Sequence, residues 1–239
     1  MKLEKTLAWL DKTLNVAAFD DVSNNGLQVD PNNQAISTVA FAVDASVRAV
    51  EAAAKAGAEL LVVHHGISWG GGIRRLTGGV GNVVRAAIES KVAVAAYHLP
   101  LDAHPTLGNN AQLAQLLGLR KVRPAFSYHG NVIGVVGTAG AVRSVGVGGR
   151  VISVPKGMVG ICSGGAGEFA EEAKALGCGA YLTGEASWGD VIAAENCGMT
   201  MICAGHYETE VFGVRALAKA MKRALKLRTV DLTDILRRP

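Results

Sequence analysis

Four of the six histidines in this 239-residue sequence come at the ends of apolar runs that have the composition of buried strands. These four are His64, His65, His98 and His206. Asp102 lies four residues after His98, and Glu210 lies four residues after His206. Neutral imidazole nitrogen and carboxylate oxygen together form a ligand set for zinc, manganese, iron and similar divalent metals. The pattern therefore predicts a metal site made of nitrogen and oxygen donors.

The spacing also indicates the chemistry of such a site. If a helix begins near His206, then Glu210 is on the same helix face and reaches the same ion. The adjacent pair His64-His65 can splay where a strand ends and serve two ions. Two ions held close together polarise a substrate oxygen and lower the pKa of a water molecule between them. We expect Glu210 to be the carboxylate that bridges them.

The elements that must position these residues alternate along the chain. An amphipathic helix is expected from Leu3 to Leu14, where leucines repeat every three or four residues. The first alternation predicts strands at 38–43, 59–63 and 92–96 and helices at 47–55, 82–89 and 109–117. The second predicts strands at 131–136, 149–154, 159–162, 180–183 and 200–203 and helices at 168–176, 191–195 and 210–225. Alternating strands and helices indicate parallel sheets with helices on their faces, which bind ligands at the carboxyl ends of the strands.

The two alternations resemble each other, and this predicts an α/β protein with two α/β domains of related topology. Residues 59–70 parallel 179–189, and residues 92–98 parallel 199–206. The charged segment Leu119–Pro124 predicts the boundary, which gives domains 1–122 and 123–239. The closing helix is free to pack back on the first domain.

Composition limits the classes of protein to which the chain can belong. Hydrophobic residues make up 49% and aromatics only 5%, which favours α/β over a sandwich or barrel. The four cysteines lie in apolar runs, and we interpret them as buried reduced thiols of a cytoplasmic protein. Neither a signal peptide nor an apolar run long enough to span a membrane is recognised. The basic segment 219–228 fits either nucleic acid or a phosphorylated substrate, or simply the end of a helix dipole.

Several motifs, taken together, resemble the Nif-three-like dinuclear metal-centre family, whose members are often described as type 2 GTP cyclohydrolase I homologues. The resemblance runs from about residue 5 to residue 225. The motifs are Asn24–Val29, His64-His65, His98–Asp102 followed by Gly108–Asn110, Leu182–Glu185 and Gly205–Glu210. Two departures are Gly66, where the family usually has proline, and Leu99-Pro100, which replace a smaller polar residue.

This resemblance implies two divalent ions per subunit, of zinc, manganese or iron, at the interface between the domains. It also implies a homohexameric ring. By likeness, His64 and His206 are ligands of one ion, His65 and Asp102 of the other, and Glu210 bridges them. His98 lines the site and either binds metal or shuttles protons, so the catalytic candidates are Glu210 and His98. No organic cofactor is implied.

The leading functional hypothesis is a metal-dependent hydrolase that acts on a nucleotide-like substrate by purine ring opening or phosphoester cleavage. The alternative is a non-catalytic metal-binding ring with a regulatory role or a nucleic-acid or protein partner. Roles left open are those of Glu185 and Glu208 (general base, partner of a metal-binding imidazole, or surface carboxylate) and of His104 (pocket or loop surface). Asn24 and Asn25 either line the site or form a turn, whereas His129 is interpreted as structural. Arg74 and Arg75 are candidates for contacting a substrate phosphate.

Overall fold

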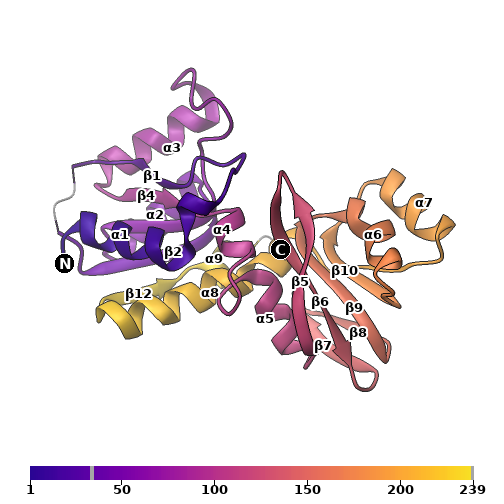
Figure 1. The fold of residues 1–239 in the computed structure, drawn as a ribbon. Helices are drawn as coiled ribbons and strands as arrows, with labels where there is room; N and C mark the ends of the chain where they lie inside the picture. Colours follow the sequence, from indigo (N-terminus) through magenta and orange to yellow (C-terminus); the bar gives the residue numbers. More distant parts are fainter. Residues whose placement is uncertain (33–34, 238–239) are drawn as a thin grey trace. The chain divides into compact units, whose positions relative to one another are not determined.

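The computed structural model describes residues 1–32 and 35–237, which form two compact units (Figure 1). Unit 1 comprises Met1–Leu101 and Val214–Pro239, and unit 2 comprises Asp102–Gly213. The chain passes into unit 2 at the end of the short helix α4 (Leu99–Asp102) and leaves it within the long helix α8 (His206–Leu225). The division therefore differs from the predicted domains 1–122 and 123–239. The charged segment at the predicted boundary is an edge strand of unit 2 and not a linker.

Unit 1 is built on a five-stranded sheet in the order β1-β4-β3-β2-β12. Its strands are β1 (Gly26–Val29), β2 (Thr38–Asp44), β3 (Leu60–His65), β4 (Ala93–Ala96) and β12 (Arg228–Asp231). The strands β12, β2, β3 and β4 run parallel, whereas β1 pairs antiparallel with β4. The central strands are almost fully buried and rich in Val, Leu and Ala, which is typical of parallel strands covered on both faces.

Helices cover both faces of this sheet. The helices α2 (Val47–Lys55) and α3 (Gly78–Glu89) pack with one face of the sheet in a cluster that includes Val50, Leu61 and Val83. Figure 1 shows α1 (Leu3–Leu14) and α8 on the side of the sheet away from α3. The short elements η1 (Val16–Ala18) and α9 (Thr233–Leu236) complete unit 1. Loops follow the carboxyl ends of β2, β3 and β4, and polar residues gather at these strand ends and in these loops.

Unit 2 has a five-stranded sheet in the order β11-β10-β9-β6-β5 and a separate hairpin, β7-β8. Its strands are β5 (Arg120–Tyr128), β6 (Asn131–Ala139), β7 (Arg143–Val147), β8 (Arg150–Val154), β9 (Gly157–Gly165), β10 (Ala180–Glu185) and β11 (Thr200–Cys203). The strands β9, β10 and β11 are parallel, and β6 and β5 extend the sheet antiparallel. The helix α5 (Asn109–Leu116) and the hairpin share one apolar core with this sheet.

Three neighbouring parallel strands in each unit follow the same order, which confirms the predicted related topology. In unit 1, β3 lies between β2 and β4, and in unit 2, β10 lies between β9 and β11. The connections in unit 2 are η2 (Gly167–Phe169) with α6 (Ala170–Ala175), and then α7 (Trp188–Asn196). The expected repeat therefore aligns β3 with β10 and β4 with β11.

Two details depart from the sequence-based expectations. Both sheets are mixed, because β1, β5 and β6 are antiparallel to their neighbours. All four cysteines are free thiols, but only Cys162 and Cys178 are buried, and Cys203 is exposed. The expectation of buried thiols is thus wrong for Cys203. Among the described residues, none of the helices has both the length and the apolar character that crossing a bilayer requires.

Candidate metal centre

Three histidines gather at the carboxyl ends of β3 and β4 in unit 1. His64 and His65 are the last two residues of β3, which ends two residues later than predicted, and His98 follows β4 by two residues. One ring nitrogen from each of the three lies within 4.8 Å of those of the other two. The His64 ring centroid is 4.6 Å from that of His65 and 5.1 Å from that of His98. The three imidazoles are therefore close enough to bind a common ion.

The hydrogen bonds of these rings fix which nitrogen carries the proton. Nδ1 of His64 lies 3.0 Å from the carbonyl oxygen of Tyr97, which can only accept, so Nδ1 donates. Nδ1 of His65 lies 2.9 Å from a carboxylate oxygen of Asp44, and the same reasoning applies. In each neutral ring, Nε2 then keeps its lone pair. This is the arrangement in which metal-binding histidines are usually held.

His98 is held by a buried carboxylate, Asp21. Oδ1 of Asp21 accepts from Nδ1 of His98 at 2.9 Å and from the backbone N–H of Ser23 at 3.0 Å. Oδ2 accepts from the side chain of Asn25 at 2.8 Å and from the N–H of Leu99 at 2.9 Å. Burial raises the pKa of Asp21, but the hydrogen bonds and the charge of His98 outweigh it, and the pKa lies below its usual value. Asp21 is therefore ionised at neutral pH and keeps the proton of His98 on Nδ1.

Two side chains of the segment Asn24–Gln28 form hydrogen bonds to the backbone of the loops that follow β3 and β4. Asn25 accepts the backbone N–H of His98 at 2.8 Å, and Oε1 of Gln28 accepts the N–H of Ile67 at 2.7 Å. A Cβ atom at Gly66 would collide with the Gln28 amide and approach Cβ of Ala96 to 2.6 Å. Glycine at position 66 thus leaves room for the Gln28 side chain.

Unit 2 contributes a histidine and a carboxylate from one helix. His206 begins α8, four residues before the predicted start of this helix at 210, and Glu210 lies one turn later with 3% of its surface exposed. Nε2 of His206 is 3.3 Å from Oε1 of Glu210, and Nδ1 is 3.0 Å from Oε1 of Glu185. A nitrogen lone pair and a carboxylate oxygen at such a distance repel unless a proton or a metal ion lies between them. This pair therefore fits a cation.

Asp102, also in unit 2, is buried and fixed by neutral donors. Its Oδ1 accepts from Nδ2 of Asn109 at 2.8 Å and from Oγ of Ser163 at 3.1 Å. Asn110 links the same region by accepting the N–H of Ser163 at 2.7 Å. The motif Gly108–Asn110 thus anchors Asp102.

The nearby thiol does not compete as a ligand. Burial raises the pKa of Cys162 well above its usual value, and the negative charges of Asp102, Glu168 and Glu210 raise it further. A thiol binds metal as the thiolate, which these neighbours disfavour. The donors described in unit 1 are imidazoles, and those in unit 2 are imidazole and carboxylate. Neither group includes the thiolates that are typical of a closed structural zinc site.

Comparison with known proteins shows the family of this chain. The sequence profile of Duf34/NIF3 (NGG1p interacting factor 3) matches residues 1–236. The chain belongs to the Duf34/NIF3 family. It is 41% identical to a GTP cyclohydrolase 1 type 2 homolog of Deinococcus radiodurans over 90% of this chain and 86% of the relative. It is 36% identical to a protein of the same name from Pyrococcus horikoshii over 98% of both. The solved structure of protein ybgI, of unknown function, is 29% identical with a TM-score of 0.87 over 100% of both chains.

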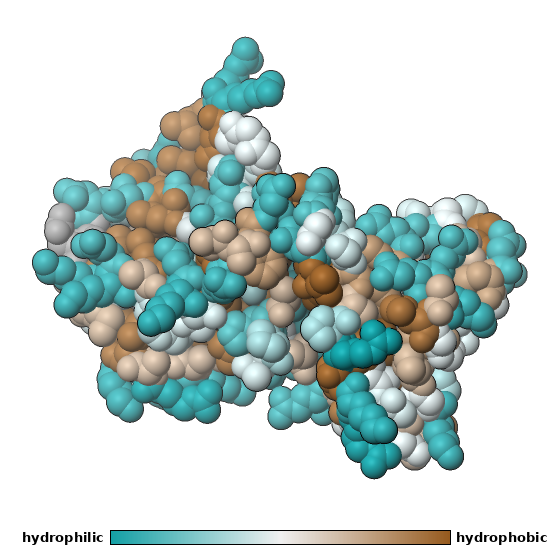
Figure 2. Space-filling model, viewed as in Figure 1, coloured by the Kyte–Doolittle hydropathy of each residue, from teal (hydrophilic) through white to brown (hydrophobic). Residues whose placement is uncertain are grey.

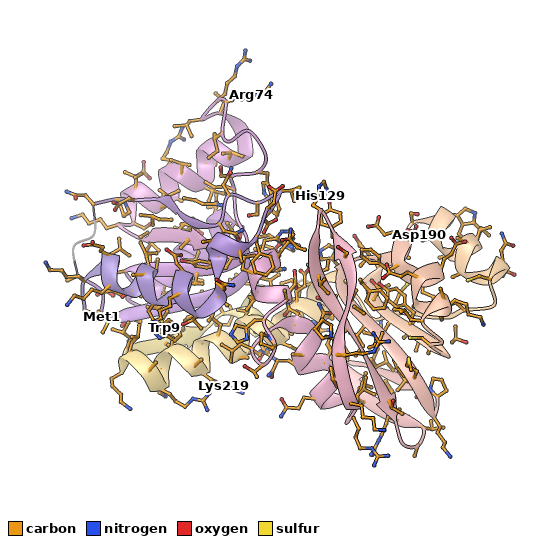
Figure 3. The ribbon with its side chains drawn as sticks, viewed as in Figure 1. Met1, Trp9, Arg74, His129, Asp190 and Lys219 are labelled. Carbon is orange, nitrogen blue, oxygen red and sulfur yellow. The ribbon has the colours of Figure 1, made fainter. Side chains whose placement is uncertain are left out.

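The structure also locates the residues of this NIF3-family protein whose roles were left open. Glu185 contacts His206 and so orients an imidazole, one of the roles considered for it. Nδ1 of His104 accepts the N–H groups of Thr106 and Leu107, so its proton is on Nε2, opposite to the histidines above. Figure 3 shows His129 at the tip of the β5-β6 turn and Arg74 at the tip of the loop before α3, pointing away from the body of unit 1. This position of Arg74 does not support its expected contact with a substrate phosphate.

Sequence reasoning missed two carboxylates that act on histidines, Asp21 and Asp44. Asp44 ends the buried strand β2, so the rule that found the histidines, a polar residue at a strand end, would also have found it. Asp21 lies in a loop 77 residues before His98, and no spacing signal connects the two. Ser163 and Thr209, which fix Asp102 and the N–H of Gly164, were also missed.

We predict that Asp21→Asn lowers the free energy of unfolding by about 1–3 kcal/mol at pH 7, because an amide nitrogen would face two buried donors. Since the folded-state pKa is lowered, this stabilisation is complete above the unfolded pKa of about 3.9 and disappears as the pH falls through the folded pKa. Urea unfolding at pH 7 and pH 3 measures it. The exposed neighbour provides the control, Asp20→Asn. An equal loss at both pH values would show that the charge of Asp21 does not matter.

Proposed function

We propose that this NIF3-family protein is a dinuclear metal-dependent hydrolase that acts on a nucleotide-like substrate. The observation that carries the proposal is the common state of His64, His65, His98 and His206. Each has Nδ1 beside an oxygen acceptor, and this orientation directs the lone pair of Nε2 to a metal ion or, at His98, to a proton. The name of the relatives, GTP cyclohydrolase 1 type 2 homolog, supports a nucleotide as the substrate class.

The proposed ligands come from both units. His64 and His206 would hold one ion, His65 and Asp102 the other, and Glu210 would bridge the two. When bound, such a pair supplies Lewis acidity that polarises a substrate oxygen and lowers the pKa of water. Asn109 and Ser163 keep Asp102 in place for this role, and Glu185 keeps the ring of His206 in place.

His98 is the proposed proton carrier. Its Nδ1 is committed to Asp21, so proton exchange takes place at Nε2. An imidazole accepts and returns protons near neutral pH, and the adjacent carboxylate stabilises the charged form that this requires. In this proposal, water attacks the substrate, Nε2 takes a proton from that water, and Nε2 then gives the proton to the leaving atom as its bond to the substrate breaks. The reaction is the ring-opening hydrolysis of a purine or the cleavage of a phosphoester.

The proposal is tested by elemental analysis of the purified protein supplied with zinc, manganese or iron, followed by a hydrolysis screen of nucleotides. We expect about two ions per chain and metal-dependent turnover.

Light scattering measures the mass of the same preparation, and we expect a homohexamer of six times the 24.7 kDa chain mass. Fewer than about one ion per chain would contradict the metal centre. Full metal loading without turnover of any nucleotide would instead favour a non-catalytic ring with a regulatory or binding role.

A further inference from the structure

A pocket of about 490 Å³ lies in unit 1 at the carboxyl ends of β2 and β3, beside the first turn of α3. We call it the α3 pocket. Its apolar walls come from Val47, Ile67, Trp69, Val80 and Val83. Figure 2 shows apolar side chains gathered on the surface over α3. The volume is within the range of sites that bind small molecules.

Trp69 belongs both to this pocket and to the histidine cluster. Nε1 of its indole donates to the carbonyl oxygen of Gly66 at 3.0 Å, so the ring is fixed in place. Its centroid lies 5.2 Å from that of His98 and 6.0 Å from that of His65. Trp69 is 39% exposed although it makes these contacts. A group bound in the α3 pocket is therefore only one side chain away from the proposed metal ligands.

Two polar side chains in the lining narrow the class of ligand. Ser46 caps α2 by accepting the N–H of Ala49 at 3.1 Å, and its hydroxyl proton can be donated to a ligand. Asn82 is exposed on α3, and its amide offers a donor and an acceptor side by side. A flat indole suits a planar ring, and an asparagine amide suits a ring with an adjacent donor and acceptor. An aliphatic chain would use neither polar group.

We propose that the α3 pocket binds the heterocyclic base of the nucleotide substrate. The inference rests on the proposed function, because it specifies the substrate class of the same site. Stacking of a base on an aromatic side chain and hydrogen bonds to Asn82 and Ser46 give the binding. The reacting part of the nucleotide then lies on the histidine side of Trp69.

A substitution at Gly79 can fill this pocket. Gly79 is the second residue of α3 and lines the pocket, and a Cβ atom placed there meets no other atom within 4 Å. Gly79→Phe should therefore fold and occupy the space of the base. The matched control is Gly189→Phe, because Gly189 is the second residue of α7 and is exposed. Substitution of Trp69 itself is less informative, since its ring contacts two of the histidines.

Binding of guanosine and adenosine is measured by calorimetry on the full chain, as purified and after EDTA treatment. We expect wild type and Gly189→Phe to bind a purine nucleoside in both preparations, and Gly79→Phe to bind it at least about tenfold more weakly. Asn82→Leu should weaken nucleoside binding and leave the binding of octanoate unchanged or stronger. The inference is overturned if no nucleoside binds, if both phenylalanine variants bind equally, or if only octanoate binds.

These outcomes are distinguishable from failure of the proposed function. Nucleoside binding that Gly79→Phe removes, in a protein that never turns over a nucleotide, would support the pocket and contradict the hydrolase. Metal-dependent turnover with an unchanged KM in Gly79→Phe would support the hydrolase and contradict the pocket.

Discussion

Replacing Glu210 by glutamine is expected to lower kcat/KM by more than about 100-fold with whichever nucleotide the protein hydrolyses, since loss even of a residue that only supports a ligand costs about 10–100-fold. Glu210 is buried and faces Nε2 of His206 at 3.3 Å. Glutamine keeps the size of the side chain and one oxygen but removes the charge that holds a cation. Assembly should be unchanged, because the variant preserves the helix.

A second measurement makes this prediction independent of finding the substrate. Added zinc or manganese raises the Tm of a protein that binds it, because only the folded state holds the ion. We expect a clear rise for wild type and a much smaller one for Glu210→Gln. Glu171→Gln, at an exposed position on α6, is the control and should behave as wild type. Equal metal-induced rises in Tm in all three proteins would show that Glu210 does not bind the metal.

The histidine pattern was readable in the sequence because the physics behind it is local. A parallel strand buried on both faces must be apolar until it ends, so a polar residue such as His64 marks the carboxyl end of a strand. The spacing of His206 and Glu210 needed only a helix that begins at His206, and α8 begins there. The repeat of one α/β unit was visible for the same reason, since each copy retains the alternation of strand and helix.

The division into units could not be read from composition. Leu119–Pro124 contains charges and a proline, which are typical of a linker, but such residues also protect the exposed edge of a sheet. In β5, the side chains from Arg120 to Pro124 are exposed, and the strand pairs with β6 on one side. Unit 1 is closed by the later turns of α8 and by β12, which pairs with β2 from 190 residues away in sequence. A single cut along the chain cannot describe such an arrangement.

The partners of the histidines were the least predictable part of the site. Tyr97 contributes only its carbonyl oxygen to His64, and a backbone group leaves no trace in residue type. Asp21 depends on a loop that returns to the end of β4, so its distance in sequence from His98 carries no information. Asn25 and Gln28 were noted as a motif, yet their function as supports of the loops that follow β3 and β4 became evident only from the hydrogen bonds.

Replacing Asp102 by asparagine is expected to remove one of the two proposed ions while leaving the fold intact. Oδ1 of Asp102 accepts from Asn109 and Ser163, and the carbonyl oxygen of an asparagine can accept both bonds. The variant therefore loses a negative charge and a donor oxygen for metal but few other contacts. Elemental analysis should fall from about two ions per chain to about one, with affinity for the lost ion reduced by more than about 100-fold.

The matched control for this experiment is Asp234→Asn, whose side chain is 86% exposed and pairs with Arg215. It should keep both ions, because a surface ion pair contributes little to the fold and nothing to the metal site. Comparing the metal content of Asp102→Asn and Glu210→Gln also tests which of the two ions each residue binds. If Asp102→Asn loses one ion and Glu210→Gln loses both, Asp102 serves a single ion and Glu210 bridges the pair. If Asp102→Asn retains both ions at full affinity, Asp102 serves only to receive the hydrogen bonds of Asn109 and Ser163.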